Sequence, residues 1–398
     1  MKNREHFWLS PYNDEPDVQE LLKDLPKKVK IYDTTLRDGE QVVGLSLDVD
    51  EKVEIAKALA NAGVDRIEAG FASSSPQDAE AVARIQATVT NAEIWGFARC
   101  NVNDVKDCLK AGVERLVCEV MTSPQKMQAW NVDEETVLKR IRDSISFAKK
   151  EGLYVAYFAV DASRARPAFL ERVYKTAVDE CGADEIVVVD TLGVASPEAM
   201  YHLTKRVRQW VKVPMAVHCH NDFGLGTACT IAALKAGADC AHVTVNGLGE
   251  KTGNCDIAEL AIALEGLYGV ETNLRLDMLR DLSKLVERIT NIKVNVQKPV
   301  VGDYAFARES GLVVAQMLSY PPSVEGYDPC VVNREREIVL GKKSGRKSIE
   351  YALEKLGRPV SDVAAVDALL AEVKRKSGEL KGSVPYSMFN ELAAKILG

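Results

Sequence analysis

The sequence predicts a (β/α)8 TIM barrel followed by a smaller, mainly helical C-terminal region. Between about residues 29 and 275, eight short β-branched runs alternate with amphipathic stretches of helical periodicity. Several of these helical stretches end beside a glycine that suits a helix stop, as in NAGV, KEGL, ECGA and KAGA. The alternation then ceases. Eight βα units in one continuous stretch are typical of a closed barrel.

The predicted strands recur at intervals of roughly 20–40 residues, which leaves room for one helix between each pair. They are Lys30–Thr34, Arg66–Phe71, Glu93–Ala98, Arg115–Val120, Tyr154–Val160, Glu185–Asp190, Met215–His220 and Ala241–Asn246. The clearest helices between them are Glu51–Ala62, Pro76–Ala87, Glu134–Glu151, Ala168–Cys181, Pro197–Val211 and Gly226–Ala236. A doubly wound open sheet is the alternative fold. It is less favoured because no GxGxxG motif opens the first helix.

These elements divide the chain into an N-terminal extension (1–28), a catalytic barrel (29–275) and a C-terminal region (276–398). In the last region, a predicted helix over Asp277–Ile289 precedes a stretch rich in proline and glycine. Two further helices are predicted over Arg346–Leu356 and Val363–Ser377.

The composition excludes several classes of partner. A net charge of −7, with 46% hydrophobic and 27% charged residues, argues against a nucleic-acid or membrane surface. No apolar run approaches the roughly 18–20 residues of a membrane span. The N-terminus has no signal-peptide pattern, and the nine cysteines form no CxxC pair. The expected compartment is therefore the cytoplasm.

The strongest local signal is HCHND at His218–Asp222, at the carboxyl end of the seventh predicted strand. Residues two apart on a strand point to the same side, so His218 and His220 should project together. Barrel active sites form at this end of the strands, and paired imidazoles suit a divalent metal. The alternative is that both rings simply pack and hydrogen-bond inside the barrel.

Two other motifs follow strands that lie beside the seventh in a closed barrel. In DTTLRDGEQ, over Asp33–Gln41, Asp38 offers the metal an oxygen ligand, and Arg37 offers a planar fork for a carboxylate or a developing enolate. In NGLGEKTGN, over Asn246–Asn254, the last residue offers an amide oxygen. A solvated charged turn and a plain glycine-rich turn are the alternatives.

Glu68 and Arg99 lie near the ends of the second and third predicted strands. Both are expected to face the site and to form an internal ion pair. His242 is expected to be structural or solvated.

Together these segments resemble the DRE-TIM metallolyase superfamily. Within it, homocitrate synthase and 2-isopropylmalate synthase are the most similar, with Re-citrate synthase and the HMG-CoA lyases as relatives. Four further motifs support the resemblance: IEAGF at Ile67–Phe71, DASR at Asp161–Arg164, DTLG at Asp190–Gly193 and LGKKSGR at Leu340–Arg346. The resemblance covers most of the chain, and the C-terminal region is similar to the small subdomains of the synthases.

The resemblance implies a homodimeric enzyme that forms a carbon–carbon bond between an acyl-CoA, expected to be acetyl-CoA, and a 2-oxo acid. It needs a divalent metal, either Mg, Mn, Co or Zn. The implied metal ligands are Asp38, His218 and His220, with Asn254 nearby. The implied catalytic side chains are Arg37, Gln41 and Thr191. The candidates for substrate contacts are Arg37, Glu68, Arg99 and Thr191.

The sequence departs from the resemblance at the residues that handle protons. The synthases use a Glu, a His and a Tyr to deprotonate acetyl-CoA, and valine stands at all three positions here. They are Val160, Val313 and Val324. Valine cannot accept or relay a proton. If the register is shifted, Glu309, Tyr320 or Tyr327 takes over this task.

The sequence is therefore compatible with three functions. Whole-chain resemblance favours a synthase that uses an acyl-CoA. The missing proton-handling residues favour a metal-dependent lyase or aldolase that cleaves a 2-hydroxy acid, or a synthase whose partner is not acetyl-CoA. A non-catalytic relative is least favoured, because it leaves the intact metal motif unexplained.

Overall fold

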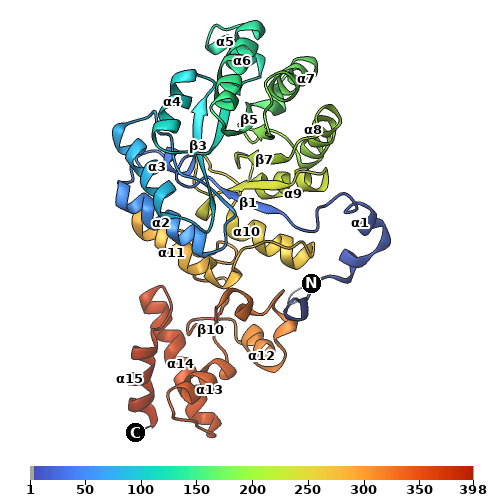
Figure 1. Ribbon diagram of the computed structural model, residues 1–398. Helices are drawn as coiled ribbons and strands as arrows, with labels where there is room; N and C mark the ends of the chain where they lie inside the picture. Colours follow the sequence, from blue (N-terminus) through green and yellow to red (C-terminus); the bar gives the residue numbers. More distant parts are fainter. Residues whose placement is uncertain (1–3, 398) are drawn as a thin grey trace. The chain divides into compact units, whose positions relative to one another are not determined.

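In the computed structural model, which describes residues 4–397, eight parallel strands close into a barrel (Figure 1). Each strand pairs with the next, and β1 also pairs with β8, so the sheet has no free edge. The strands are β1 (Lys30–Asp33), β2 (Arg66–Glu68), β3 (Glu93–Arg99), β4 (Arg115–Met121), β5 (Tyr154–Val160), β6 (Glu185–Asp190), β7 (Met215–Cys219) and β8 (Cys240–Val243). The predicted TIM barrel is confirmed, and the doubly wound sheet is excluded.

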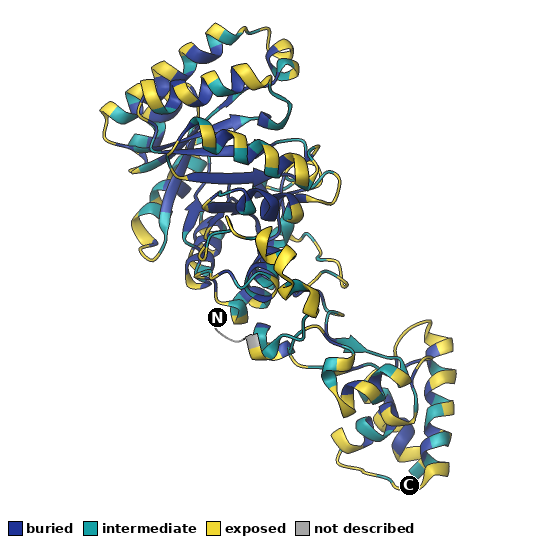
Figure 2. Ribbon diagram, turned by 90° about the vertical axis from the view of Figure 1, so that its right-hand side faces the viewer, coloured by how far each residue is buried: buried dark blue, intermediate teal, exposed yellow. Residues whose placement is uncertain are grey.

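Helices follow each of the eight strands and cover the barrel, with buried inner faces and exposed outer faces (Figure 2). They are α2 (Val49–Asn61), α3 (Pro76–Thr88), α4 (Val102–Lys110), α5 (Pro124–Ala129), α6 (Glu134–Lys150), α7 (Pro167–Lys175), α8 (Pro197–Trp210), α9 (Gly226–Lys235) and α10 (Ile257–Ile262). Many begin at a side-chain cap. The Asp48 carboxylate accepts from the backbone N–H of Glu51, whose own carboxylate accepts from the N–H of Asp48.

The barrel interior is packed in layers, so only its carboxyl end is open for chemistry. Near the amino end, Arg66 donates to both carboxylate oxygens of Glu185 at 2.8 and 2.9 Å. Above this pair lies an apolar layer that includes Tyr32, Trp95 and Val117. The polar residues of the candidate site therefore lie at the carboxyl ends of the strands.

The chain divides into two compact units, whose boundaries differ from the expected ones. The first covers Pro11–Val294 and contains α1 (Pro16–Glu20) and α11 (Leu279–Thr290), which contacts α2. The sequence placed this last helix in the C-terminal region, because its periodicity shows that one face is buried but not against which partner. The expected extension over residues 1–28 likewise divides after Ser10.

The second unit combines residues 4–10 with residues 295–397. Its helices are α12 (Gly311–Ser319), α13 (Arg346–Lys355), α14 (Val363–Leu380) and α15 (Tyr386–Leu397), and β9 (Ala307–Arg308) pairs with β10 (Glu337–Ile338). It has its own apolar core, which includes Ile349, Leu369 and Phe389. Over the described part of the chain, no helix combines the length and apolar character that a membrane crossing requires.

Candidate active site

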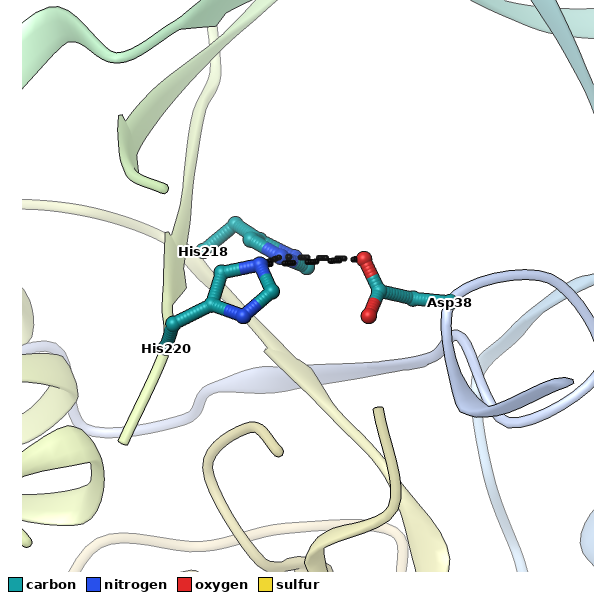
Figure 3. A group of neighbouring side chains, drawn as sticks. All are labelled: Asp38, His218 and His220. Carbon is teal, nitrogen blue, oxygen red and sulfur yellow. Dashed lines mark hydrogen bonds and ion pairs between the residues drawn. The ribbon is translucent and has the colours of Figure 1, made fainter. Parts of the chain in front are cut away.

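Three side chains that lie far apart in the sequence converge at the carboxyl end of the barrel (Figure 3). His218 lies in β7, His220 directly follows it, and Asp38 lies in the loop after β1. The Asp38 Oδ2 atom lies 3.6 Å from His218 Nε2 and 3.8 Å from His220 Nε2, and the two nitrogens are 3.3 Å apart. Among residues 4–397, no other group of three His, Cys, Asp or Glu side chains meets in this way.

The protonation states of this triad suit a divalent cation. Burial lowers the pKa of both imidazoles, although the Asp38 carboxylate opposes that shift, so each ring keeps a lone pair. Burial alone would raise the pKa of Asp38, but Arg37, His218, His220 and the hydrogen bond from Asn254 together outweigh it and hold the pKa well below its usual range. Two neutral nitrogens and one carboxylate oxygen form a mixed ligand set of the kind that Zn, Mn, Co or Mg accepts.

Asn254 provides a further donor atom beside the triad. An isolated bridge pairs it with His220, and its Nδ2 donates to Asp38 Oδ1 at 2.8 Å and to the Leu248 carbonyl at 3.0 Å. The amide oxygen is buried and has no hydrogen-bond partner within the described residues. A buried oxygen without a partner is costly unless something binds it, so Asn254 fits a metal bound at the triad.

Arg37 is held rigidly between two carboxylates. Its Nε donates to Glu68 and its Nη1 to Asp38, both at 2.8 Å, and its guanidinium lies 4.5 Å from the centre of the Phe97 ring. A second aromatic ring, Phe158, lies 5.9 Å away. The remaining nitrogen, Nη2, is buried and meets no acceptor among the described residues. This fixed, unused N–H donor is suited to an oxygen that gains negative charge.

The expected ion pair between Glu68 and Arg99 is wrong. Glu68 is fully buried and pairs with Arg37, whereas Arg99 donates to Asp104 at 2.7 and 3.1 Å. Asp104 and Glu68 are both possible partners of Arg99, and Asp104 is much nearer to it along the chain. Asp104 lies in the first turn of α4, directly after β3, so it reaches Arg99 before a residue of another strand does. Glu68 therefore contributes to the site by holding Arg37 in place.

Two other predicted residues lie near the triad without touching it. The hydroxyl oxygen of Thr191, which follows β6, accepts from the backbone N–H of Asp161 at 2.9 Å, so its own hydrogen remains available to a ligand. Gln41 is exposed and lines a cavity of about 240 Å³ together with Arg37, Phe71 and Phe97.

The sequence interpretation missed two charged residues of this region. The ammonium of Lys251 donates to the Thr191 carbonyl at 3.0 Å and lies 3.4 Å from Asp222 Oδ2. Glu119 lies in β4, and its charge couples to Arg37. The available signals were the lysine inside the GEKTGN motif and a lone acid in the apolar run RLVCEVM.

We expect Gly249→Ala to weaken metal binding about 10- to 100-fold, the range for residues that support metal ligands. Gly249 has a φ of +157°, and an added Cβ would lie 2.2 Å from Asn254 Nδ2 and 2.9 Å from Asp38 Oδ1. The site must therefore shift. Calorimetric titration with Mn²⁺ measures the change. Gly44→Ala is the control, because φ is also positive (+82°) but nothing lies within 4 Å. Equal Mn²⁺ affinity in both variants would contradict this account of the loop.

The chain is similar to known proteins over most of its length. The family model described as HMGL-like matches residues 28–286, and that of the homocitrate synthase post-HMGL domain matches residues 300–380. A homocitrate synthase of Methanopyrus kandleri is 41% identical, with 96% of each chain covered. A putative (R)-citramalate synthase of Archaeoglobus fulgidus is 45% identical over 83% of this chain and 68% of its own. A 2-isopropylmalate synthase of Methanocaldococcus jannaschii is 41% identical over 92% and 71%.

Solved structures share the fold at lower identity. The HMG-CoA lyase of Pseudomonas aeruginosa superposes with a TM-score of 0.62 at 23% identity, covering 68% of this chain and 96% of its own. Family membership is shown by the matched family model and by the relatives at 41–45% identity, and not by these structures. The chain therefore belongs to the HMGL-like family of DRE-TIM barrels, and it carries the homocitrate synthase post-HMGL domain as well.

Proposed function

We propose that this protein is an acyltransferase-type synthase, which condenses acetyl-CoA with a 2-oxo acid by using a divalent metal at Asp38, His218 and His220. The convergence of these three ligand atoms within 4.8 Å of one another is the observation that carries the proposal. The named relatives, a homocitrate, a citramalate and a 2-isopropylmalate synthase, support the reaction class. A homodimer in the cytoplasm remains a prediction.

The chain's own residues bind and orient the oxo acid in this proposal. When bound, the metal supplies Lewis-acid polarisation of the oxo group. The free Nη2 of Arg37 donates a hydrogen bond to the oxygen that gains negative charge, and the Thr191 hydroxyl donates to the carboxylate of the oxo acid. Phe97 and Phe158 flank the guanidinium and keep water from it, which strengthens these hydrogen bonds.

A lyase that runs the same chemistry in reverse is the second candidate. Val160 packs against the apolar layer of the barrel, and Val324 packs against the cluster of Val314, Met317 and Ile338. Because valine cannot accept a proton, no base acts from either of these two positions. Glu309 is engaged by Lys343, whose backbone N–H donates to it at 2.9 Å. A cleavage reaction depends less on a remote base, because the proton to be removed is on the hydroxyl beside the metal.

We expect the purified protein with Mg²⁺ or Mn²⁺ to release free CoA from acetyl-CoA in the presence of a 2-oxo acid. A thiol-release assay with pyruvate, oxaloacetate, 2-oxoisovalerate and 2-oxoglutarate in parallel measures this, and EDTA should abolish the signal. Release with none of the four would rule out the simple synthase. Formation of an oxo acid from a 2-hydroxy acid in that case would favour the lyase.

A further inference from the structure

Glu119 places a carboxylate on the inner side of the barrel wall, at the end where the candidate site lies. It lies in β4, where it pairs in register with Arg99 of β3 and with Phe158 of β5. Val117, two residues earlier, belongs to the apolar layer of the barrel, as does Phe158. Because side chains two apart on a strand share a side, Glu119 points into the barrel above that layer.

The side chain of Glu119 has no hydrogen-bond or ion-pair partner among the described residues, unlike the other carboxylates at the carboxyl ends of the strands. Hydrogen bonds or ion pairs engage each of the others: Asp33 with Thr35, Glu68 with Arg37, Asp161 with Arg164 and Asp190 with Ser163. The carboxylate of Glu119, in contrast, forms no hydrogen bond or ion pair with any residue between 4 and 397, and only its backbone carbonyl accepts a hydrogen bond, from the N–H of Cys100 at 2.7 Å. Its side chain is also partly accessible to solvent, so a small molecule in the barrel mouth can reach it.

Burial and the charged groups around Glu119 together determine its pKa. The groups that act on it are Arg37, Arg99, Glu68, Asp38, Lys126 and Cys100. Burial raises the pKa of Glu119 to about 7, against the opposing effect of Arg37. A carboxylate with this pKa is a stronger base than a solvated one and is still ionised in a large fraction of molecules at neutral pH.

We propose that Glu119 is the general base that removes a proton from the methyl carbon of acetyl-CoA, a role that rests on the proposed function. The condensation needs such a base, and Glu119 is a carboxylate without a side-chain partner in the described part of the chain, whose charge acts on Arg37. One carboxylate oxygen takes the proton as the C–H bond breaks. The released electron pair forms the new C–C bond, and the carbonyl π pair moves onto the oxo oxygen beside Arg37. The oxo oxygen then takes a proton from water and becomes the hydroxyl group of the product. Water hydrolyses the thioester to a carboxylate and the CoA thiol, and Glu119 returns its proton to solvent through the barrel mouth.

The test compares Glu119→Gln with wild type, using acetyl-CoA and whichever oxo acid gives CoA release. Glutamine keeps the size and hydrogen bonding but cannot accept the proton. We expect kcat to fall by about 100- to 10,000-fold, with the KM of the oxo acid changed by no more than about threefold. Glu114→Gln is the control, because Glu114 directly precedes the same strand but is 73% exposed in its side chain. Unchanged Mn²⁺ affinity shows that the metal site is intact.

Isotope effects distinguish a base from a residue that only positions Arg37. In Glu119→Asp, which keeps a misplaced carboxylate, we expect the rate difference between acetyl-CoA and its methyl-deuterated form to exceed that of wild type, because proton removal becomes slower. A fall in rate with no larger isotope effect, a selective rise in the oxo-acid KM, or full activity of Glu119→Gln would overturn the inference. If wild type itself releases no CoA, the proposed function fails first.

Discussion

Replacement of His218 by alanine is expected to remove measurable binding of divalent metal and to lower kcat by about a thousandfold or more. His218 and His220 provide the two nitrogens of the triad, so the variant keeps one nitrogen and one carboxylate. Two ligands hold a cation far more weakly than three, and the buried Asp38 loses the partner that lies 3.6 Å away. Metal analysis of the dialysed protein, together with the thiol-release assay, measures both effects.

His202→Ala is the matched control for this variant. It removes an imidazole from an exposed position on α8, outside the candidate site. It should keep the metal content and the activity of wild type. Retention of full metal content by His218→Ala would mean that the ion binds elsewhere.

Replacement of Arg37 by alanine is expected to destabilise the barrel by about 3–5 kcal/mol, the typical loss when one partner of a buried ion pair is removed. Arg37 is 7% exposed, and its loss leaves the buried carboxylates of Glu68 and Asp38 without a cation. The same change removes the N–H donor that faces the site, so kcat should fall as well. Urea denaturation gives the free energy of unfolding.

The loss of stability in Arg37→Ala is expected to depend on pH in a defined direction. Burial already raises the pKa of Glu68, and without Arg37 that pKa rises further. A carboxyl group whose pKa is higher in the folded state than in the unfolded state favours folding as the pH falls. The stability deficit of Arg37→Ala should therefore be smaller at pH 6 than at pH 8. Arg37→Lys keeps the charge but not the planar fork, and should be intermediate. An unchanged urea midpoint in Arg37→Ala would contradict this view of the site.

Much of the barrel could be predicted from local sequence, because each strand is a short β-branched run between amphipathic helices. The bounds of β5 and β6 coincide with the predicted ones. Two helices of the second unit, α12 and α15, were not predicted. The first lies within a stretch marked by proline and glycine. Such residues locate turns but do not show that the chain between two turns is helical.

Some residues of the candidate site could likewise be predicted from local sequence, whereas others depend on tertiary contacts. The spacing of His218 and His220 fixes their common side, and a closed barrel brings the loop that contains Asp38 near them. The partner of Glu68 and the position of Glu119 depend instead on which side chains meet across strands. Periodicity alone does not identify those partners. The Val160 and Val324 substitutions were visible in the sequence, whereas the free carboxylate of Glu119 became evident only from its contacts.

The central claim is that Asp38, His218 and His220 hold one cation between them. Anomalous diffraction at the manganese edge, from crystals soaked in Mn²⁺, tests it most directly. The expected result is one strong peak within about 2.0–2.3 Å of Asp38 Oδ2 and of both Nε2 atoms. A well-occupied peak elsewhere, with these three atoms ligating nothing, would contradict the claim.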